Sequence, residues 1–201
     1  MPSNEFHFIT HWRVPGTVAE VAEVLADATG LARWWPSVYL GVAELDPGDE
    51  RGLGKVVELH TKAWLPYTFR WQFRVTEVHA AGSALAATGD FEGRGIWSFR
   101  QDGREVAVTY DWKILVEKPI LRQLSFVLKP IYAANHRWAM ARGEESLKLE
   151  LARRHAASAA ERALVPAPPA ATRVRPEVVI VGLLGAAAVL WLIASQPWRD
   201  D

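Results

Sequence analysis

Regular alternation of apolar and polar residues constrains the fold of this 201-residue chain more than any other feature. It is cleanest in YTFRWQFRVTEV, residues 67–78, where every second side chain from Tyr67 to Val75 is aromatic or aliphatic. Successive side chains of a strand point to opposite faces, so this period of two predicts a strand with one buried face. Similar patterns predict strands near residues 6–14, 38–45, 55–63, 84–91, 95–100 and 105–116. The sequence therefore predicts an antiparallel sheet.

Helical spacing replaces this alternation in two segments. Thr17 is a suitable N-cap for a helix over residues 18–28. A second helical pattern runs from residue 119 to about residue 154. Because proline is favoured in the first turn of a helix, we expect a short segment near residues 120–128 and a long helix that begins at Pro130.

Polar residues lie on the face of this long helix that we expect to be buried, if each residue turns by about 100°. That face contains Leu124, Leu128, Ile131, Trp138 and Leu149, with Asn135 and Arg142 at its centre. A buried amide or guanidinium group without a partner is costly, so both residues must be paired. We expect them either to bond to strand residues, which is the more common situation, or to meet a ligand. The Arg142 side chain can also extend to solvent.

The C-terminal run VVIVGLLGAAAVLWLIAS, residues 178–195, contains no charged residue. At about 1.5 Å per residue, this run forms a helix of roughly 27 Å, close to the hydrocarbon thickness of a bilayer. A buried core helix is the alternative, but no polar face interrupts the run. We therefore expect a single transmembrane helix at residues 178–196. Gly182 and Ala186 have the spacing that would allow weak self-association of two such anchors.

The segment before this anchor is rich in alanine and proline. Residues 157–177 contain four prolines, which prevent a continuous helix and favour an extended spacer. We therefore expect a globular domain at residues 1–156, a linker at residues 157–177 and the anchor at residues 178–196. More arginines precede the anchor than follow it, which predicts that the domain is cytoplasmic. The absence of cysteine is compatible with that reducing compartment.

Charge and composition argue against several classes of partner. The chain carries 23 basic and 23 acidic residues without a basic stripe interleaved with aromatic residues, so no nucleic-acid partner is expected. It lacks a closely spaced His and Cys cluster, a phosphate-binding glycine loop and a nucleophile elbow, so no metal or other cofactor is expected.

Ten tryptophans are present, eight of them before residue 157. Such large rings either fill a core or line an apolar cavity.

Three segments carry a likeness to a known family. They are VPGTVAEVAEVLADATGLARWWPSV near the start, GRGIWSFRQDGREVAVTYDWKI in the late strands and NHRWAMARGEESLKLELARR in the last helix. Over residues 5–154 the chain resembles the START-like or SRPBCC superfamily, which includes polyketide cyclases and dehydrases, Bet v 1-like proteins and lipid-transfer START domains. The resemblance implies an α+β helix-grip fold, in which a curved antiparallel sheet wraps around a long C-terminal helix. It also implies a cavity between them for lipids, sterols, polyketides or other apolar molecules.

The resemblance and the strand and helix faces together assign a ligand-binding wall. Its expected residues are Trp71, Trp97, Phe99, Tyr110, Trp112, Asn135, Trp138 and Arg142. Arg142 is permanently charged and is suited to orienting an anionic head group. The first hypothesis is a membrane-anchored module that binds or carries a hydrophobic small molecule or lipid beside the membrane that supplies it.

The alternative hypothesis is a polyketide cyclase or dehydratase-type enzyme with a general acid or base in the same cavity. Its candidates are His136, Asp111, Tyr110 and Glu92. His136 is expected about 100° from the centre of the buried helix face, and Asp111 points away from the apolar side of its strand. We therefore assign no catalytic residue, and whether the domain is an enzyme stays open. A third hypothesis is a scaffold whose interior is filled by its own tryptophans.

Overall fold

The computed structural model describes residues 5–65, 67–116 and 125–172. Within these ranges the strands are β1 (Glu5–Pro15), β2 (Tyr39–Asp46), β3 (Val56–Lys62), β4 (Thr68–His79), β5 (Gly82–Gly89), β6 (Phe91–Asp102) and β7 (Glu105–Val116). The helices are α1 (Val18–Ala26), the short turn η1 (Ala28–Gly30), α2 (Leu31–Trp34), α4 (Ser125–His155) and α5 (Ala159–Leu164). The compact unit that these elements form extends to Ala171.

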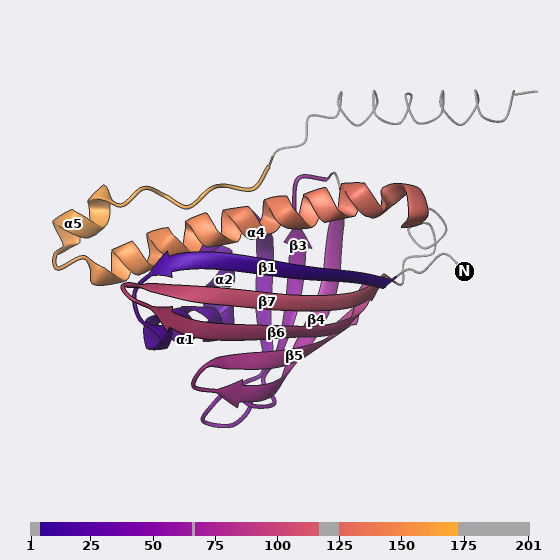
Figure 1. Cartoon of the computed structure of the whole chain (residues 1–201), viewed down its shortest axis with the longest axis horizontal. Helices are drawn as coiled ribbons and strands as arrows, with labels where there is room; N and C mark the ends of the chain where they lie inside the picture. Colours follow the sequence, from indigo (N-terminus) through magenta and orange to yellow (C-terminus); the bar gives the residue numbers. More distant parts are fainter. Residues whose placement is uncertain (1–4, 66, 117–124, 173–201) are drawn as a thin grey trace, which may run out of the picture. The chain divides into compact units, whose positions relative to one another are not determined.

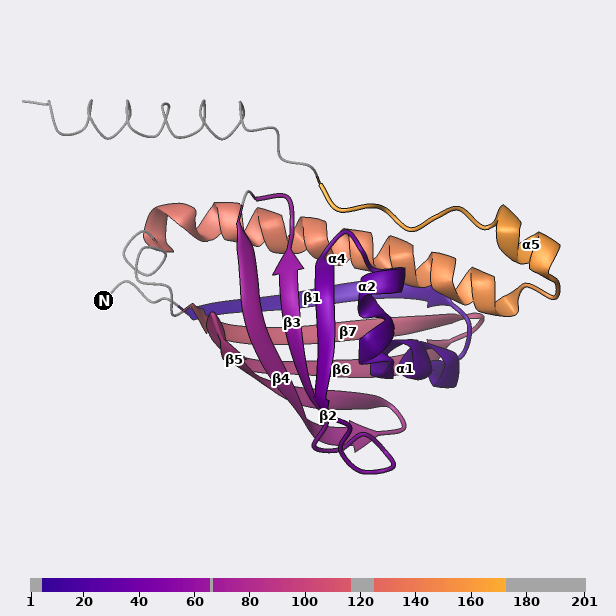
Figure 2. The same cartoon turned by 180° about the vertical axis from the view of Figure 1, so that it is seen from behind.

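The strands form one antiparallel sheet in the order β1-β7-β6-β5-β4-β3-β2. The first strand pairs with the last along its whole length, from Glu5 opposite Leu115 to Pro15 opposite Glu105. The sheet is curved, and α4 lies along its inner side (Figure 1). Seen from behind, α1 and α2 cover the end of the same side (Figure 2). This arrangement confirms the predicted α+β helix-grip architecture.

The buried face of the sheet follows the predicted alternation. In β7, Val106 and Val108 are almost completely buried, and Tyr110 and Trp112 retain 8% and 6% exposure. Trp71 of β4 is also buried and belongs to the same hydrophobic core. Removal of such side chains from water is the main favourable term in folding. The concave face of the sheet is therefore the core of the domain.

The corner between β1 and α1 is fixed by a capping box and by one glutamine. The Thr17 hydroxyl accepts a hydrogen bond from the Glu20 backbone N–H at 3.3 Å, and the Glu20 carboxylate accepts one from the Thr17 N–H at 2.7 Å. Gln101 of β6 accepts from the Val18 N–H at 3.1 Å and donates to the Gly16 carbonyl at 2.9 Å. These bonds set the angle at which α1 leaves the sheet.

Helix α4 does not have the predicted boundaries. It is continuous from Ser125 to His155 and contains Pro130, whereas the sequence predicted a helix that begins at Pro130. A proline inside a helix removes one hydrogen bond and crowds the preceding turn. The helix accommodates this cost because Pro130 lies in the second turn of a 31-residue helix, so a single bond near one end is lost.

The segment that follows α4 includes a short helix where an extended linker was predicted. The Ser158 hydroxyl accepts a hydrogen bond from the Glu161 N–H at 3.1 Å and caps α5. After α5, the Arg153 guanidinium of α4 donates to the Pro166 carbonyl oxygen. The first part of the predicted linker is therefore structured and packed on α4.

The predicted membrane anchor at residues 178–196, its orientation and its self-association lie outside the described residues. Across the ranges that the structure describes, no helix combines the length and the hydropathy required to span a bilayer.

Candidate functional site

A partly open cavity of about 160 Å³ lies between the concave face of the sheet and the N-terminal half of α4. From the strands and the loops next to them come Phe6, Phe8, Thr61, Lys62, Ala63, Tyr67, Phe69, Trp71, Phe91, Tyr110, Trp112 and Ile114. From the segment around the start of β2 come Trp35, Val38 and Tyr39, and from α4 come Tyr132, Asn135, His136, Ala139 and Met140. More than half of these residues are Phe, Tyr or Trp, so the cavity presents mainly aromatic surface.

The sheet side of the cavity is a packed layer of rings. The Trp71 ring centroid lies 4.9 Å from that of Phe91 and 5.8 Å from that of Trp112. The Trp71 indole N–H donates to the Thr61 hydroxyl at 3.1 Å, so its polar atom is satisfied inside the core. Rings held by neighbours on several sides keep their orientation, and the wall is therefore preformed.

The helix side of the cavity follows a regular spacing along α4. Tyr132, Asn135, His136, Ala139 and Met140 all line it, which is the pattern of one helical face. The Asn135 side-chain oxygen accepts a hydrogen bond from the Leu65 N–H at 3.2 Å, so this partly buried amide is paired with a loop residue rather than with a strand residue. The loop before β4 and the N-terminal half of α4 are thereby joined at the edge of the cavity.

His136 is a site residue that the sequence analysis placed away from the cavity. Its ring stacks on Phe8, with centroids 4.3 Å apart and planes 15° apart, and its Nε2 lies 3.4 Å from the Thr10 hydroxyl oxygen. Burial, with a smaller effect from the positive charge of Arg137, lowers the pKa of His136 to about 4. The imidazole is therefore neutral near pH 7, with one ring nitrogen that accepts a hydrogen bond, and the same burial makes it a weaker base than a free imidazole.

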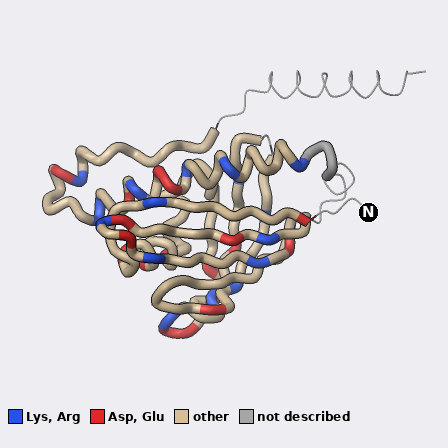
Figure 3. The backbone as a smooth tube through the Cα atoms, in the orientation of Figure 1, with Lys and Arg blue, Asp and Glu red and all other residues tan. Residues whose placement is uncertain are grey.

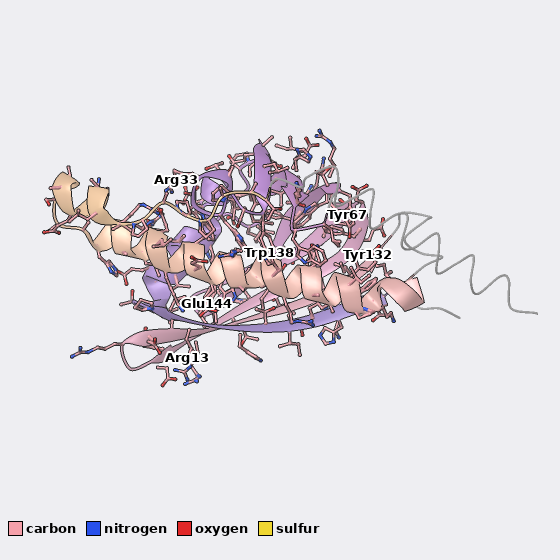
Figure 4. All side chains as sticks on the ribbon, turned by 90° about the horizontal axis from the view of Figure 1, so that it is seen from above. Arg13, Arg33, Tyr67, Tyr132, Trp138 and Glu144 are labelled. Atoms are coloured by element: carbon pink, nitrogen blue, oxygen red, sulfur yellow. The ribbon has the colours of Figure 1, made fainter. Side chains whose placement is uncertain are left out.

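Four tyrosines of the wall keep their protons at physiological pH. Burial raises the pKa of Tyr39, Tyr67, Tyr110 and Tyr132 above the ordinary value. Tyr67 lies immediately before β4 and Tyr132 lies on α4, so the two come from distant parts of the sequence (Figure 4). Their ring centroids are 6.4 Å apart, with the planes at 78°. The wall therefore offers phenol donors rather than phenolates.

Four of the eight predicted ligand-binding residues line this cavity: Trp71, Tyr110, Trp112 and Asn135. Trp97 and Phe99 lie instead on a second cavity of about 320 Å³ between α1 and strands β4 to β6. Trp138 and Arg142 line neither of these two cavities. That the first four contact a ligand stays a prediction, since position in the wall is all that the structure establishes.

Trp138 and Arg142 correct the predicted face of α4. The Arg142 side chain is 43% exposed and donates to the Glu145 carboxylate at 2.8 Å, so it does not point into the core. The buried face passes instead through Ala139 and Gly143. A Cβ atom at Gly143 would lie 2.2 Å from the Trp35 ring, so only a residue without a side chain fits there. The helix therefore places small residues against the sheet side here, because the Trp35 ring fills the space next to Gly143.

The remaining acid and base candidates lie outside the cavity. Asp111 accepts from the His7 ring at 3.0 Å on the outer face of the sheet, and Glu92 is exposed. Basic and acidic residues are interspersed along the strands and α4 (Figure 3). Residues 5–65, 67–116 and 125–172 contain no group of His, Asp or Glu side chains arranged to hold a metal ion.

The aromatic residues form a continuous series of contacts through the core. Trp34, Trp35, Trp12, Trp97, Tyr110, Trp112 and Trp71 follow one another with ring centroids between 4.0 and 5.8 Å apart. Trp97 stacks on Tyr110 between the two cavities. The rings therefore connect the second cavity to the wall of the first.

The sequence matches no protein-family model and no curated protein. Among solved structures, the fold is similar to the Zhui aromatase/cyclase from a Streptomyces species, with a TM-score of 0.62 and 18% sequence identity over 77% of this chain and 98% of that chain. This chain has the START-like helix-grip fold. The predicted resemblance is thereby confirmed at the level of the fold.

Two further structures show the same helix-grip domain. A protein from Thermus thermophilus matches with a TM-score of 0.59 and 16% identity, over 71% of this chain and 97% of that one. Norcoclaurine synthase from Thalictrum flavum, solved with dopamine and hydroxybenzaldehyde, matches with a TM-score of 0.50 and 12% identity, over 77% and 90% of the two chains. At these identities the likeness describes the fold of the domain.

Proposed function

We propose that this domain binds a compact, largely aromatic small molecule in the cavity beneath α4. The composition of the wall carries the proposal, because rings from both the sheet and the helix surround the same space. Burial of apolar surface contributes about 25 cal/mol per Å². Small-molecule sites are commonly apolar clefts with a few polar groups that orient the ligand. Dopamine and hydroxybenzaldehyde, which are bound in the structure of norcoclaurine synthase, are likewise compact aromatic molecules with a single ring.

The volume of the cavity favours a small ligand. An engineered apolar cavity of about 150 Å³ binds benzene. A cavity of about 160 Å³ is therefore suited to one ring or two fused rings rather than to a sterol or a long acyl chain. A ligand of this size is enclosed by the rings of the sheet on one side and by α4 on the other.

Binding is tested with two Ala→Leu variants on the same helix. Ala139→Leu places a larger side chain in the cavity, whereas Ala141→Leu changes an exposed position. We expect the full chain to bind naphthalene saturably in equilibrium dialysis, Ala139→Leu to weaken that binding at least tenfold and Ala141→Leu to leave it unchanged. Equal affinity of the Ala139→Leu variant would place the ligand elsewhere.

We also propose that residues 178–196 anchor the chain in a membrane, with the domain on the cytoplasmic side. The uncharged run and the arginine bias support this proposal. An apolar ligand is concentrated in lipid, so an anchored carrier would meet it there. The full chain should sediment with membranes, and a chain without residues 177–201 should not. Digestion of the domain by protease added to intact cells would contradict the orientation.

A second candidate function, acid–base catalysis of a cyclase or dehydratase type, is favoured by His136. The position of its imidazole in the cavity wall meets the geometric requirement for a general base, and a bound substrate would have to raise its lowered pKa toward neutrality for that role. The ligand that co-purifies with the full chain, identified by mass spectrometry, should be returned unchanged by a carrier. Its conversion by the wild type, with loss of conversion in His136→Ala or Tyr110→Phe, would establish an enzyme instead.

A further inference from the structure

Two tyrosine hydroxyls lie near each other in the wall of the cavity, and neither has a well-formed hydrogen bond. The oxygens of Tyr67 and Tyr132 are both shielded from solvent, and neither forms a hydrogen bond of ordinary geometry with the part of the protein that the structure describes. A buried hydroxyl without a partner is costly, and such groups are usually paired. Both residues line the ligand cavity, so a bound molecule is in a position to supply the missing partner.

The protonation of these groups decides what that partner must be. Burial raises the pKa of Tyr67, and the charge and the hydrogen bonding of the neighbouring Tyr132 raise it further. Burial also raises the pKa of Tyr132, against the opposing effect of hydrogen bonding from Tyr67. Each phenol therefore retains its proton. The Tyr67 hydroxyl is near enough to Tyr132 to direct its proton there, so at least the second proton of the pair lacks an acceptor. A ligand group that only donates hydrogen bonds would leave that proton unpaired.

Asn135 adds a third donor to the wall of the same cavity. Asn135 lies one turn after Tyr132 on α4, and its side-chain oxygen is occupied by the Leu65 N–H at 3.2 Å. The NH₂ group of the same amide takes no part in this bond and is a hydrogen-bond donor. Leu65 also lies two residues before Tyr67 in the loop that leads into β4. The loop and the helix thus bring three donors to one corner of an otherwise aromatic cavity, named below the donor corner (Tyr67, Tyr132 and Asn135).

We propose that the donor corner recognises a carbonyl oxygen, so that the ligand is a small aromatic ketone, aldehyde or quinone bound with its oxygen between Tyr67 and Tyr132. A carbonyl oxygen has two lone pairs and can accept from both phenols at once. The rings of Trp71, Trp112 and Phe91 then contact the apolar body of the ligand. This inference rests on the proposed function, because it assigns the polar end of the molecule that the cavity binds.

The test compares two probes of similar shape, 2-acetylnaphthalene and 2-ethylnaphthalene, by equilibrium dialysis against the full chain. Tyr67→Phe and Tyr132→Phe each remove one oxygen and keep the ring. We expect each variant to lose about fivefold affinity for the ketone, and the double variant more than tenfold, with the affinity for the hydrocarbon unchanged. Binding of the hydrocarbon also shows that each variant is folded.

Ala141→Leu is the position control. It changes an exposed position of α4 that does not line the cavity, and it should leave the affinity for both probes unchanged. A direct signature is the infrared carbonyl stretch of bound ¹³C-labelled 2-acetylnaphthalene. It should lie at lower wavenumber in the wild type than in the double variant, because hydrogen bonding weakens the C=O bond.

The outcomes separate this inference from the proposed function. If neither probe binds the wild type, the cavity is not a site for aromatic molecules and both proposals fail. If both probes bind and both lose affinity equally in the tyrosine variants, the hydroxyls serve packing and only the carbonyl assignment is overturned. Tighter binding of 2-naphthoate than of the ketone, abolished by Lys62→Met, would move the polar end of the ligand to Lys62 and overturn it as well.

Discussion

The two halves of α4 rest on the same domain but on different surfaces. The C-terminal half, from Gly143 onward, is tightly fixed. The buried Glu150 carboxylate accepts from both terminal nitrogens of Arg33 at 2.8 and 3.0 Å. Near the end of the helix, Arg154 donates to Glu23 at 2.7 Å. Leu147, three residues before Glu150, is completely buried in the hydrophobic core.

The N-terminal half faces the cavity and makes looser contacts. Asn135 and His136 contact Leu65 and Thr10 at 3.2 and 3.4 Å, and Ala139 lines open space. One stretch of the helix therefore supplies stability, and another forms the wall of the cavity. The C-terminal half holds the helix on the sheet, which allows the N-terminal half to leave a cavity without loss of the fold.

The sharpest test replaces two small residues, one turn apart, by leucine. In Gly143→Leu the new side chain meets the Trp35 ring, and we expect the free energy of unfolding to fall by about 3 kcal/mol. In Ala139→Leu the side chain enters the cavity and should change that free energy by less than about 1 kcal/mol. Urea unfolding of the full chain, followed by circular dichroism, measures both. Equal destabilisation would remove the distinction between the halves.

Glu150→Gln tests the ion pairs of the fixed half. Hydrogen bonds from Arg33 and Arg154 lower the pKa of Glu150 against the opposing effect of its burial. The charged form therefore stabilises the fold above the ordinary pKa, and this contribution is lost as the pH falls through the lowered value. At pH 7 we expect the substitution to cost about 2 kcal/mol in urea unfolding. In the double variant Glu150→Gln with Arg33→Met, the loss of unfolding free energy should be clearly smaller than the sum of the two single losses. A loss equal to that sum would mean that Arg33 and Glu150 are not coupled.

His136 tests the cavity half through the pH dependence of stability. Its pKa is lowered to about 4, so the unfolded chain takes up a proton at higher pH than the folded chain does. The free energy of unfolding should therefore decrease as the pH falls from about 6.5 to about 4, by on the order of 2 kcal/mol. Subtracting the profile of His136→Gln isolates this effect. Parallel profiles of the two proteins would show that the imidazole titrates as in water.

Arg142→Ala should have the smallest effect. The side chain lies on the outer side of α4 and pairs with Glu145 three residues later. Exposed pairs of this kind contribute little, so we expect a loss of less than about 0.5 kcal/mol in urea unfolding. Binding of 2-acetylnaphthalene should also be unchanged. A large loss of affinity would restore Arg142 to the site that the sequence predicted.

The strands could be predicted from the sequence, and the face of α4 could be predicted only in part. In β4 and β7 every second residue is large and apolar, so the period of two leaves no doubt about the buried side. On α4 the bulky Trp138 led to a wrong prediction of the centre of the buried helix face. Beside the cavity and Trp35, the inner face of the helix carries His136, Ala139 and Gly143, which are polar or small because the rings below them occupy the volume. The Ala139 and Gly143 spacing was the available signal, yet it becomes informative only once Trp35 is known to lie beneath it.

The series of aromatic contacts through the core has a consequence for spectroscopy. Six tryptophans from Trp34 to Trp71 are linked through neighbouring rings, so their excited states are coupled and excitation passes between them. The emission of the domain is therefore a collective property, which no single Trp→Phe substitution isolates. A molecule bound beside Trp71 or Trp112 drains excitation absorbed at the far end of the core. Total tryptophan emission should therefore report occupancy of the cavity, even when the light is absorbed by a tryptophan outside it.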